Sequence, residues 1–231
     1  MRYLYFLLFI GLVGCNETTS EGSSEEAVSK AVSSEESTVK EATIIVSDSD
    51  HSGKIKQPSC EDIDGLEVSD FDRVPAGFNG LAYCCVEGKV DRLCYFKDGK
   101  HDGICREWHR ENGQLEEEIN IKNGKRDGVW RTWYKNGQLK VESSWKDDKW
   151  NGIKKAWYEN GQLSYEANYK AGKRDGVERR WHENGQLKVD RNYKDGKLDG
   201  VSKKWYKNGQ LHFEENYKDG ELLSGEGVSQ Y

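Results

Sequence analysis

Apolar and polar residues alternate through the second half of the chain, in segments separated by short turns rich in Gly, Asn and Asp. Such alternation is typical of β-strands that have one buried and one solvated face. The tetrapeptide Asn-Gly-Gln-Leu recurs at a constant spacing of 24 residues, beginning at Asn112, Asn136, Asn160, Asn184 and Asn208. A fixed period this short indicates an array of stacked units.

Each unit is expected to contain two strands and two turns. Asn-Gly between alternating segments favours a two-residue type I′ hairpin, in which both central residues have positive φ. A second turn lies between successive hairpins, as in residues 122–128, 170–176 and 194–200. The sequence therefore predicts an all-β fold, an elongated single-layer antiparallel meander of stacked 24-residue β-hairpin repeats with about ten strands.

The position of the Asn136-Gly137 turn also predicts which residues face each other across the hairpin. The expected pairs are Tyr134 with Leu139, Trp133 with Lys140, and Arg131 with Glu142. The base–acid pair recurs in three later repeats as Lys155 with Glu166, Arg179 with Asp190, and Lys203 with Glu214. Facing opposite charges stabilise a hairpin and help to set its register, so we interpret these residues as structural.

Two sets of residues are candidates for binding. The first is an aromatic ladder, which comprises Trp108, Trp133, Trp157, Trp181, Trp205, Tyr134, Tyr158 and Tyr206. The tryptophans should share a face with the charge pairs, whereas Tyr134, Leu139, Val141 and Trp145 should lie on the other face. The second is a row of turn lysines without an assigned acidic partner, Lys97, Lys122, Lys146, Lys170, Lys194 and Lys218. Ring stacking within the sheet and contact with a ligand both remain open for the aromatics.

The overall composition, with 35% hydrophobic and 33% charged residues, is lean for a deep core. The net charge of −6 is unevenly distributed. Residues 16–50 hold nine acidic and two basic residues, whereas residues 97–219 hold 22 acidic and 27 basic residues. The acidity therefore belongs to the front of the chain, and its low apolar content predicts a disordered tether there.

The first fifteen residues, MRYLYFLLFIGLVGC, have the proportions of a secretory signal. Leu12 to Cys15 resembles a bacterial lipobox, and this resemblance implies lipidation of Cys15 and a place outside the cytoplasm. An ordinary signal peptide or a short membrane anchor is the alternative. The expected segments are a signal peptide at 1–14, a Ser/Glu-rich tether at 15–57, a Cys-containing cap with a degenerate repeat at 58–103, five repeats at 104–219 and a cap remnant at 220–231.

The remaining five cysteines all precede the regular repeats, and in an oxidising compartment they indicate disulfides. If the turn at 97–102 closes a hairpin, Cys94 faces Cys105 and Phe96 faces Gly103. We expect a Cys94–Cys105 bridge, with Cys60 joined to Cys84 or Cys85. No zinc-ligand spacing or catalytic constellation is recognisable, so we expect no catalytic residues, no metal and no cofactor.

The repeat, written Gly-Val-x-x-x-Trp-Tyr-x-Asn-Gly-Gln-Leu-x-x-Glu-x-x-Tyr-Lys-Asp-Gly-Lys, resembles the variant MORN repeat of bacterial YwqK-like proteins over about residues 97–219. The resemblance implies a single-layer sheet used for protein or lipid contact. Many members of that family are described as antitoxins, which must meet a toxin in the cytoplasm. The segment ending at Cys15 is at odds with that role.

Our leading hypothesis is a non-enzymatic, lipid-anchored scaffold in the bacterial cell envelope, periplasmic or surface-exposed, which presents an aromatic β-ribbon to an unknown protein. One alternative is a module that binds cell-wall carbohydrate through its rings. Another is a module that binds anionic lipid through the turn lysines. A YwqK-type antitoxin follows if the chain is not exported, and nucleic acid is the partner that export and the compensated charge disfavour.

Overall fold

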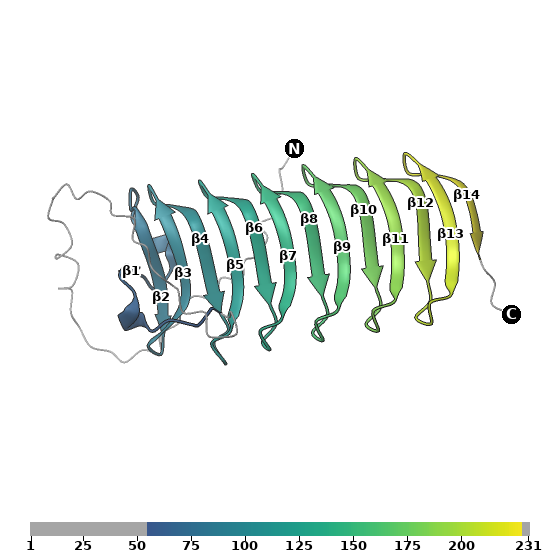
Figure 1. The fold of residues 1–231 in the computed structure, drawn as a ribbon. Helices are drawn as coiled ribbons and strands as arrows, with labels where there is room; N and C mark the ends of the chain where they lie inside the picture. The colour runs from purple at the N-terminus through teal and green to yellow at the C-terminus, as the bar shows by residue number, and fades with distance from the viewer. Residues whose placement is uncertain (1–54, 228–231) are drawn as a thin grey trace, which may run out of the picture.

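The computed structural model describes residues 55–227, which form one 14-stranded sheet whose strands follow one another in chain order. Figure 1 shows the strands side by side, with successive turns on opposite long edges. The strands are β1 Leu66–Glu67, β2 Gly80–Val86, β3 Lys89–Lys97, β4 Lys100–Trp108, β5 Leu115–Lys122, β6 Lys125–Trp133, β7 Leu139–Lys146, β8 Lys149–Trp157, β9 Leu163–Lys170, β10 Lys173–Trp181, β11 Leu187–Lys194, β12 Lys197–Trp205, β13 Leu211–Lys218 and β14 Glu221–Gly227.

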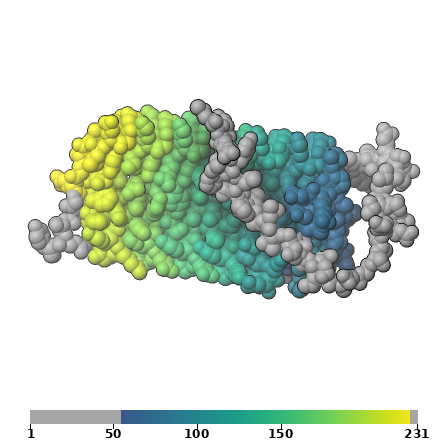
Figure 2. All heavy atoms as spheres, turned by 180° about the vertical axis from the view of Figure 1, so that it is seen from behind, coloured from purple at the N-terminus to yellow at the C-terminus, as the bar shows by residue number. Residues whose placement is uncertain are grey.

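The predicted single-layer meander of 24-residue hairpin repeats is confirmed. All strand pairs from β2 to β14 are antiparallel, and only the two-residue β1 pairs with β2 in parallel. The colours in Figure 2 change in one direction along the molecule, because each strand lies against its neighbours in sequence. The fold is therefore an array in which a repeat contacts the repeat before it and the repeat after it.

The type I′ turns lie at the opposite end of the repeat from the one we predicted. Asn123 and Gly124 have φ of 51° and 75°, as type I′ requires, and the equivalent residues of the other repeats also have positive φ. At the Asn-Gly-Gln-Leu turn only the glycine is left-handed, with φ of 81° at Gly137. There the Gly137 N–H donates to the Tyr134 carbonyl at 2.8 Å, so a longer loop with a left-handed glycine closes the hairpin.

The longer loop changes the register next to it. Arg131 pairs with Glu142 as predicted, and the base–acid pairs of the three later repeats are also confirmed. A bulge then follows Thr132, so that Trp133 faces Leu139. The predicted pairs of Trp133 with Lys140 and of Tyr134 with Leu139 were therefore wrong, because they assumed a two-residue loop.

A second irregularity is built on the glycine of each Asp-Gly-Val or equivalent segment. At Gly128 φ is 120°, and a Cβ there would lie 2.9 Å from the Cβ of Asn120. The Asn120 side chain instead donates a 2.8 Å hydrogen bond to the Val129 carbonyl across the strands. Glycine is needed here both for the backbone conformation and for the close approach of the neighbouring strand.

The N-terminal end of the sheet is thicker than the rest, because residues 55–79 cover both of its faces. On one face, Ile63 packs with Leu93 and Trp108 in a buried cluster. On the other, Phe71, which lies in the short 3-10 helix η2 (Phe71–Arg73), packs with Phe96. The second short helix, η1, spans Cys60–Asp62. This end therefore supplies the deep core that the repeats lack.

The predicted Cys94–Cys105 disulfide is present, and the two residues face each other across β3 and β4. Cys60 bonds to Cys85, one of its two expected partners, and Cys84 is buried. Phe96 faces His101 rather than Gly103, because a bulge separates it from the Cys94 pair.

The expected signal peptide, lipidation site at Cys15 and most of the tether lie outside the described residues. No helix among residues 55–227 is long and apolar enough to span a membrane.

Candidate functional site

One face of the sheet, here called the ion-pair face, carries a ladder of alternating charges. Arg131 Nε lies 2.7 Å from Glu142 Oε2, and Arg131 also contacts Glu118 on its other side. The ladder continues across facing strands as Lys155, Glu166, Arg179, Asp190, Lys203 and Glu214. Opposite charges alternate along this row, so this face offers little net attraction to an ion.

The predicted tryptophan ladder lies at the strand ends beside the Asn-Gly-Gln-Leu turns. Trp108 is 1% exposed and packs in a cluster with Leu115 and Trp133. The corresponding leucine, Leu139, faces Trp133, so tryptophan and leucine meet across the strand end instead of lying on opposite faces as expected. Trp157, Trp181 and Trp205 face Leu163, Leu187 and Leu211 in the same way.

The tyrosines of that predicted ladder connect successive repeats. Tyr134 Oη donates to the Trp157 carbonyl and Tyr158 Oη to the Trp181 carbonyl, both at 2.8 Å. His182 Nε2 lies 3.1 Å from the Trp205 carbonyl, so histidine takes the same position. Tyr206 instead contacts the ring of His212. Most of the predicted aromatic ladder is therefore engaged within the array.

The predicted row of turn lysines is partly neutralised. Across most of the two-residue turns a lysine faces another lysine, as Lys122 faces Lys125, but Lys218 faces Glu221. However, Lys146 Nζ lies 2.7 Å from Asp127 and Lys218 Nζ lies 2.9 Å from Asp199. These hydrogen bonds raise the pKa of both lysines. The prediction that turn lysines lack acidic partners was wrong at these two positions.

The opposite face, here called the ring face, carries a row of aromatic side chains in mutual contact. The ring centroids of Trp130 and Trp145 lie 5.6 Å apart, those of Trp145 and Trp150 5.2 Å, and those of Trp150 and Tyr169 5.1 Å. Trp145 faces Trp150 across the β7–β8 turn, and Tyr169 follows on β9. Only Trp145 among these four is buried, and the others are half-buried. The ring face therefore presents a continuous aromatic strip across four strands.

Cations cover this strip. The Arg126 guanidinium lies 3.7 Å from the centroid of the Trp145 ring, and Lys154 Nζ lies 4.4 Å from that of Trp150. Burial lowers the pKa of Lys154. The pattern continues along the sheet with Arg174 over Tyr193, Arg180 over Tyr165, and Lys204 over Phe213. Cation–π contact of this kind stabilises both partners and holds the cationic groups at the surface.

A buried carboxylate organises the middle of the ring face. Glu178 is fully buried, with Arg180 Nε 2.8 Å from one of its oxygens and Arg174 Nε 3.1 Å from the other. Tyr165 and Tyr169 join beside it through their hydroxyls at 2.9 Å. Burial and then this hydrogen bond raise the pKa of Tyr165. The two arginines are thus held in place by a group that is itself hidden from solvent.

The ring face between β6 and β13 is cationic. Cross-strand pairing places six cations on it, Arg126, Lys154, Arg174, Arg180, Arg191 and Lys204. It places two carboxylates there, Glu178 and Glu215, and Asp148 in the β7–β8 turn pairs with Arg126 at 3.0 Å. The excess of positive charge and the aromatic strip coincide, and this combination is the candidate site.

Our sequence interpretation did not identify most of this site. It placed Trp145 on the correct face but did not assign a register through the second turn, which brings Trp150 and Arg174 into the row. The sequence does contain a signal for this aromatic row, because Trp145, Tyr169, Tyr193 and Tyr217 recur at the 24-residue period.

Comparison with known families agrees with this geometry. The sequence matches the MORN repeat variant over residues 102–123, 126–147, 150–171, 174–195 and 198–219. The chain carries five MORN repeats of the variant type. Each of these MORN repeats covers two strands of the sheet, the first β4 and β5 and the last β12 and β13.

Comparison with curated proteins gave no match. Among solved structures, the crystal structure of TarM is similar at 17% identity and a TM-score of 0.27, over 41% of this chain and 20% of that one. A mutant of S. aureus TarM in complex with Fondaparinux, alpha-GlcNAc-glycerol and UDP is similar at 17% identity and a TM-score of 0.28, over 42% of this chain and 19% of that one. The MORN-repeat chain thus spans about a fifth of those structures, and the likeness carries no argument about function.

Proposed function

We propose that this MORN-repeat chain is a non-enzymatic scaffold, lipid-anchored through Cys15 outside the cytoplasm, whose ring face binds an acidic protein partner. The observation that carries the proposal is the coincidence of the aromatic strip with six cations on one face. Tyrosine, tryptophan and arginine are the residues most enriched in protein-binding hot spots. An acidic partner complements the charge of this face, which speeds association and favours correct partners.

The contrast between the two faces supports the choice of the ring face. On the ion-pair face each base of the charge ladder has an acid beside it, as Lys203 has Glu214 at 3.0 Å. On the ring face, Lys154 and Lys204 contact rings instead of carboxylates. Their charge is therefore left to attract an anionic partner.

The proposed location rests on the sequence around Cys15, which resembles a lipobox, and on the two disulfides. Disulfides persist in oxidising compartments and are rare in the cytoplasm. Residues 16–50, which carry nine acids against two bases, would separate the sheet from the membrane.

The face that binds can be tested by photo-crosslinking in intact cells. A photoreactive phenylalanine analogue replaces Lys204 on the ring face or Lys155 on the ion-pair face. Both lysines are half-buried, so the two sites are matched in accessibility. We expect the analogue at position 204 to yield one protein adduct of defined mass. The yield of this adduct should fall as salt is raised, because the attraction is electrostatic. The absence of an adduct at Lys204, or equal adducts at both sites, contradicts the ring-face proposal.

The location is tested by metabolic labelling with a clickable fatty acid in cells that carry the wild type or Cys15→Ala, followed by membrane fractionation. We expect label and membrane association in the wild type and neither in the variant. An unlabelled, cytoplasmic wild type would contradict the anchor and would make a YwqK-type antitoxin the leading alternative.

A further inference from the structure

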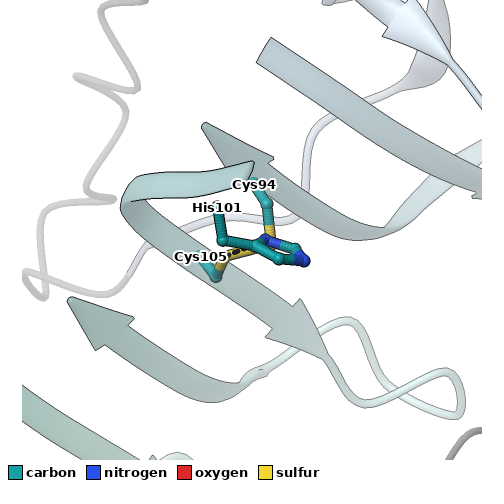
Figure 3. A group of neighbouring side chains, drawn as sticks. All are labelled: Cys94, His101 and Cys105. Carbon is teal, nitrogen blue, oxygen red and sulfur yellow. Dashed lines mark hydrogen bonds between the residues drawn. A yellow bond between two sulfur atoms is a disulfide. The ribbon is translucent and has the colours of Figure 1, made fainter. Parts of the chain in front are cut away.

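Three side chains of types that can bind a metal ion lie together beside the η2 segment, at the N-terminal end of the ring face. Cys94 and Cys105 face each other across β3 and β4 and form a disulfide. His101 lies in β4, with its Nδ1 3.4 Å from Cys105 Sγ. Figure 3 shows the imidazole beside the bond between the two sulfurs. The two sulfurs and an imidazole nitrogen all lie within 4.8 Å of one another.

The hairpin holds these groups in place. Asp98 and Gly99 form its two-residue turn, and Gly103 lies between the histidine and Cys105 with φ of 128°. A Cβ at Gly103 would lie 2.8 Å from the Cβ of Tyr95, so the strands approach closely here. His101 and Cys105 are four residues apart in β4 and their side chains are in contact, so both point to the same face of the sheet.

Aromatic rings surround the imidazole. The centroid of the His101 ring lies 4.3 Å from that of Phe96 and 5.6 Å from that of Phe71, which approaches edge-on. Cys94 is 2% exposed and Cys105 is 7% exposed. Packed rings restrict the imidazole to few orientations, which is what a preorganised ligand needs.

We propose that reduction of the Cys94–Cys105 disulfide converts this cluster into a zinc site, with Cys94 Sγ, Cys105 Sγ and His101 Nδ1 as the ligands. Two thiolates and one imidazole are a ligand set that zinc takes, and three protein ligands leave the fourth position for water. Zn–S bonds of about 2.3 Å in tetrahedral geometry place the sulfurs roughly 3.7 Å apart. The Cα atoms of the two cysteines are 4.1 Å apart, so rotation of the side chains achieves that separation.

The conversion is balanced with a dithiol as the reductant. The dithiol supplies two electrons and two protons, the S–S bond breaks, and the dithiol becomes a disulfide while Cys94 and Cys105 become thiols. Zinc then binds the two sulfurs as thiolates, and the two thiol protons pass to solvent. The disulfide and the zinc complex are mutually exclusive, because both use the same two sulfur atoms.

The net charge of the complex suits its surroundings. One Zn²⁺ with two thiolates and a neutral imidazole carries no net charge, so the cost of burying the ion among Phe71 and Phe96 is small. The other disulfide, Cys60–Cys85, belongs to the cluster on the opposite face of the sheet. The two cysteine pairs therefore do not compete for one ion.

The test uses the full chain with Cys15→Ala in every variant, so that the thiol of Cys15 does not bind zinc. The protein is reduced with a phosphine, the phosphine is removed under nitrogen, and Zn²⁺ is titrated in competition with a chromophoric chelator. Co²⁺ serves as a second probe, because its visible bands report tetrahedral thiolate ligation. Proton release on zinc binding is measured in parallel. His101→Phe removes the nitrogen ligand but keeps a ring against Phe96, and His212→Phe is the matched control.

We expect the reduced chain to bind one zinc at this cluster with release of about two protons. The oxidised chain should bind none there. His101→Phe should weaken zinc binding by more than the roughly 10–100-fold that loss of an outer-shell group costs, whereas His212→Phe should not change it.

Unchanged affinity in reduced His101→Phe overturns the proposal. Zinc binding that survives Cys94→Ser but is lost in Cys60→Ser also overturns it, since the ion would then belong to the other cysteines. Circular dichroism of each variant shows whether the sheet is folded, and the proton count on the wild type tests the site without any substitution.

Discussion

Tyr134 Oη donates a 2.8 Å hydrogen bond to the main-chain carbonyl of Trp157, in the next repeat. The same bond recurs from Tyr158 to Trp181. His109 and His182 occupy the equivalent position, each with Nε2 near the carbonyl of the following tryptophan. One side-chain position thus links each repeat to the next, in addition to the main-chain ladder.

Replacing Tyr134 with Phe removes only the hydroxyl of this link. The Trp157 carbonyl loses a partner, so we expect the free energy of unfolding to fall by about 0.5–1.5 kcal/mol. Tyr206→Phe is the control, because within residues 55–227 the Tyr206 hydroxyl makes no hydrogen bond. Urea unfolding followed by tryptophan fluorescence measures both. An equal loss in the two variants would contradict a specific link.

Glu178 holds Arg174 and Arg180 on the ring face, and its side chain is 1% exposed. Glu178→Gln keeps the shape but leaves two guanidiniums without their carboxylate. We expect a loss of about 1–3 kcal/mol, less than for a fully buried ion pair, because both arginines are partly exposed to solvent. Glu166→Gln on the ion-pair face is the control and should cost at most about 1 kcal/mol. Thermal unfolding of the two variants shows which substitution lowers the stability more.

Ala171 is the first of the two central residues of a type I′ turn, with φ of 49°. The equivalent positions hold Asn123, Asp147 and Asp195, and these residue types tolerate the left-handed conformation better than alanine does. We expect Ala171→Asn to raise the free energy of unfolding by about 0.5–1 kcal/mol. The reciprocal change Asn123→Ala should lower it by a similar amount. A destabilised Ala171→Asn would show that the turn is strained for another reason.

Glu117 on β5 faces Glu107 on β4, and Glu116 and Arg92 are also near. Burial and then the Glu107 charge raise the pKa of Glu117 above 4.5. The folded state therefore favours the protonated carboxyl of Glu117. The contribution of this group to the free energy of unfolding is fully present below pH 4.5 and is lost as pH rises through the folded pKa.

Glu117→Gln removes the like charge and its pH dependence. We expect the variant to be more stable than the wild type at pH 7 by about 0.2–1 kcal/mol, and the difference to shrink as pH falls toward 4.5. Urea midpoints across this pH range provide the measurement. A difference that does not change with pH would mean that the carboxyl does not titrate in this range.

The 24-residue period was enough to predict the sheet. The base–acid ladder and the Cys94–Cys105 pair were also predicted correctly, although the turns beside them were not, because a bulge in each hairpin restores the register that the predicted turns implied. The Trp133 pairing failed because loop length depends on whether Asn136 is left-handed, which an Asn-Gly dipeptide alone does not decide. The ring face and the approach of His101 to Cys105 depend on bulges, and a one-residue shift there changes which side chains meet.

The strands of this MORN-repeat sheet cross its long axis, as Figure 1 shows, and antiparallel hydrogen bonds run perpendicular to strands. Tension along the molecule therefore loads the strand pairs in series, so the weakest pair yields before the others. β13 and β14 place Glu214 opposite Glu226, a repulsive pair at the outer edge. Under a pull from the C-terminal end, the array should open there first and shorten one strand at a time, while the repeats behind the opening keep their structure.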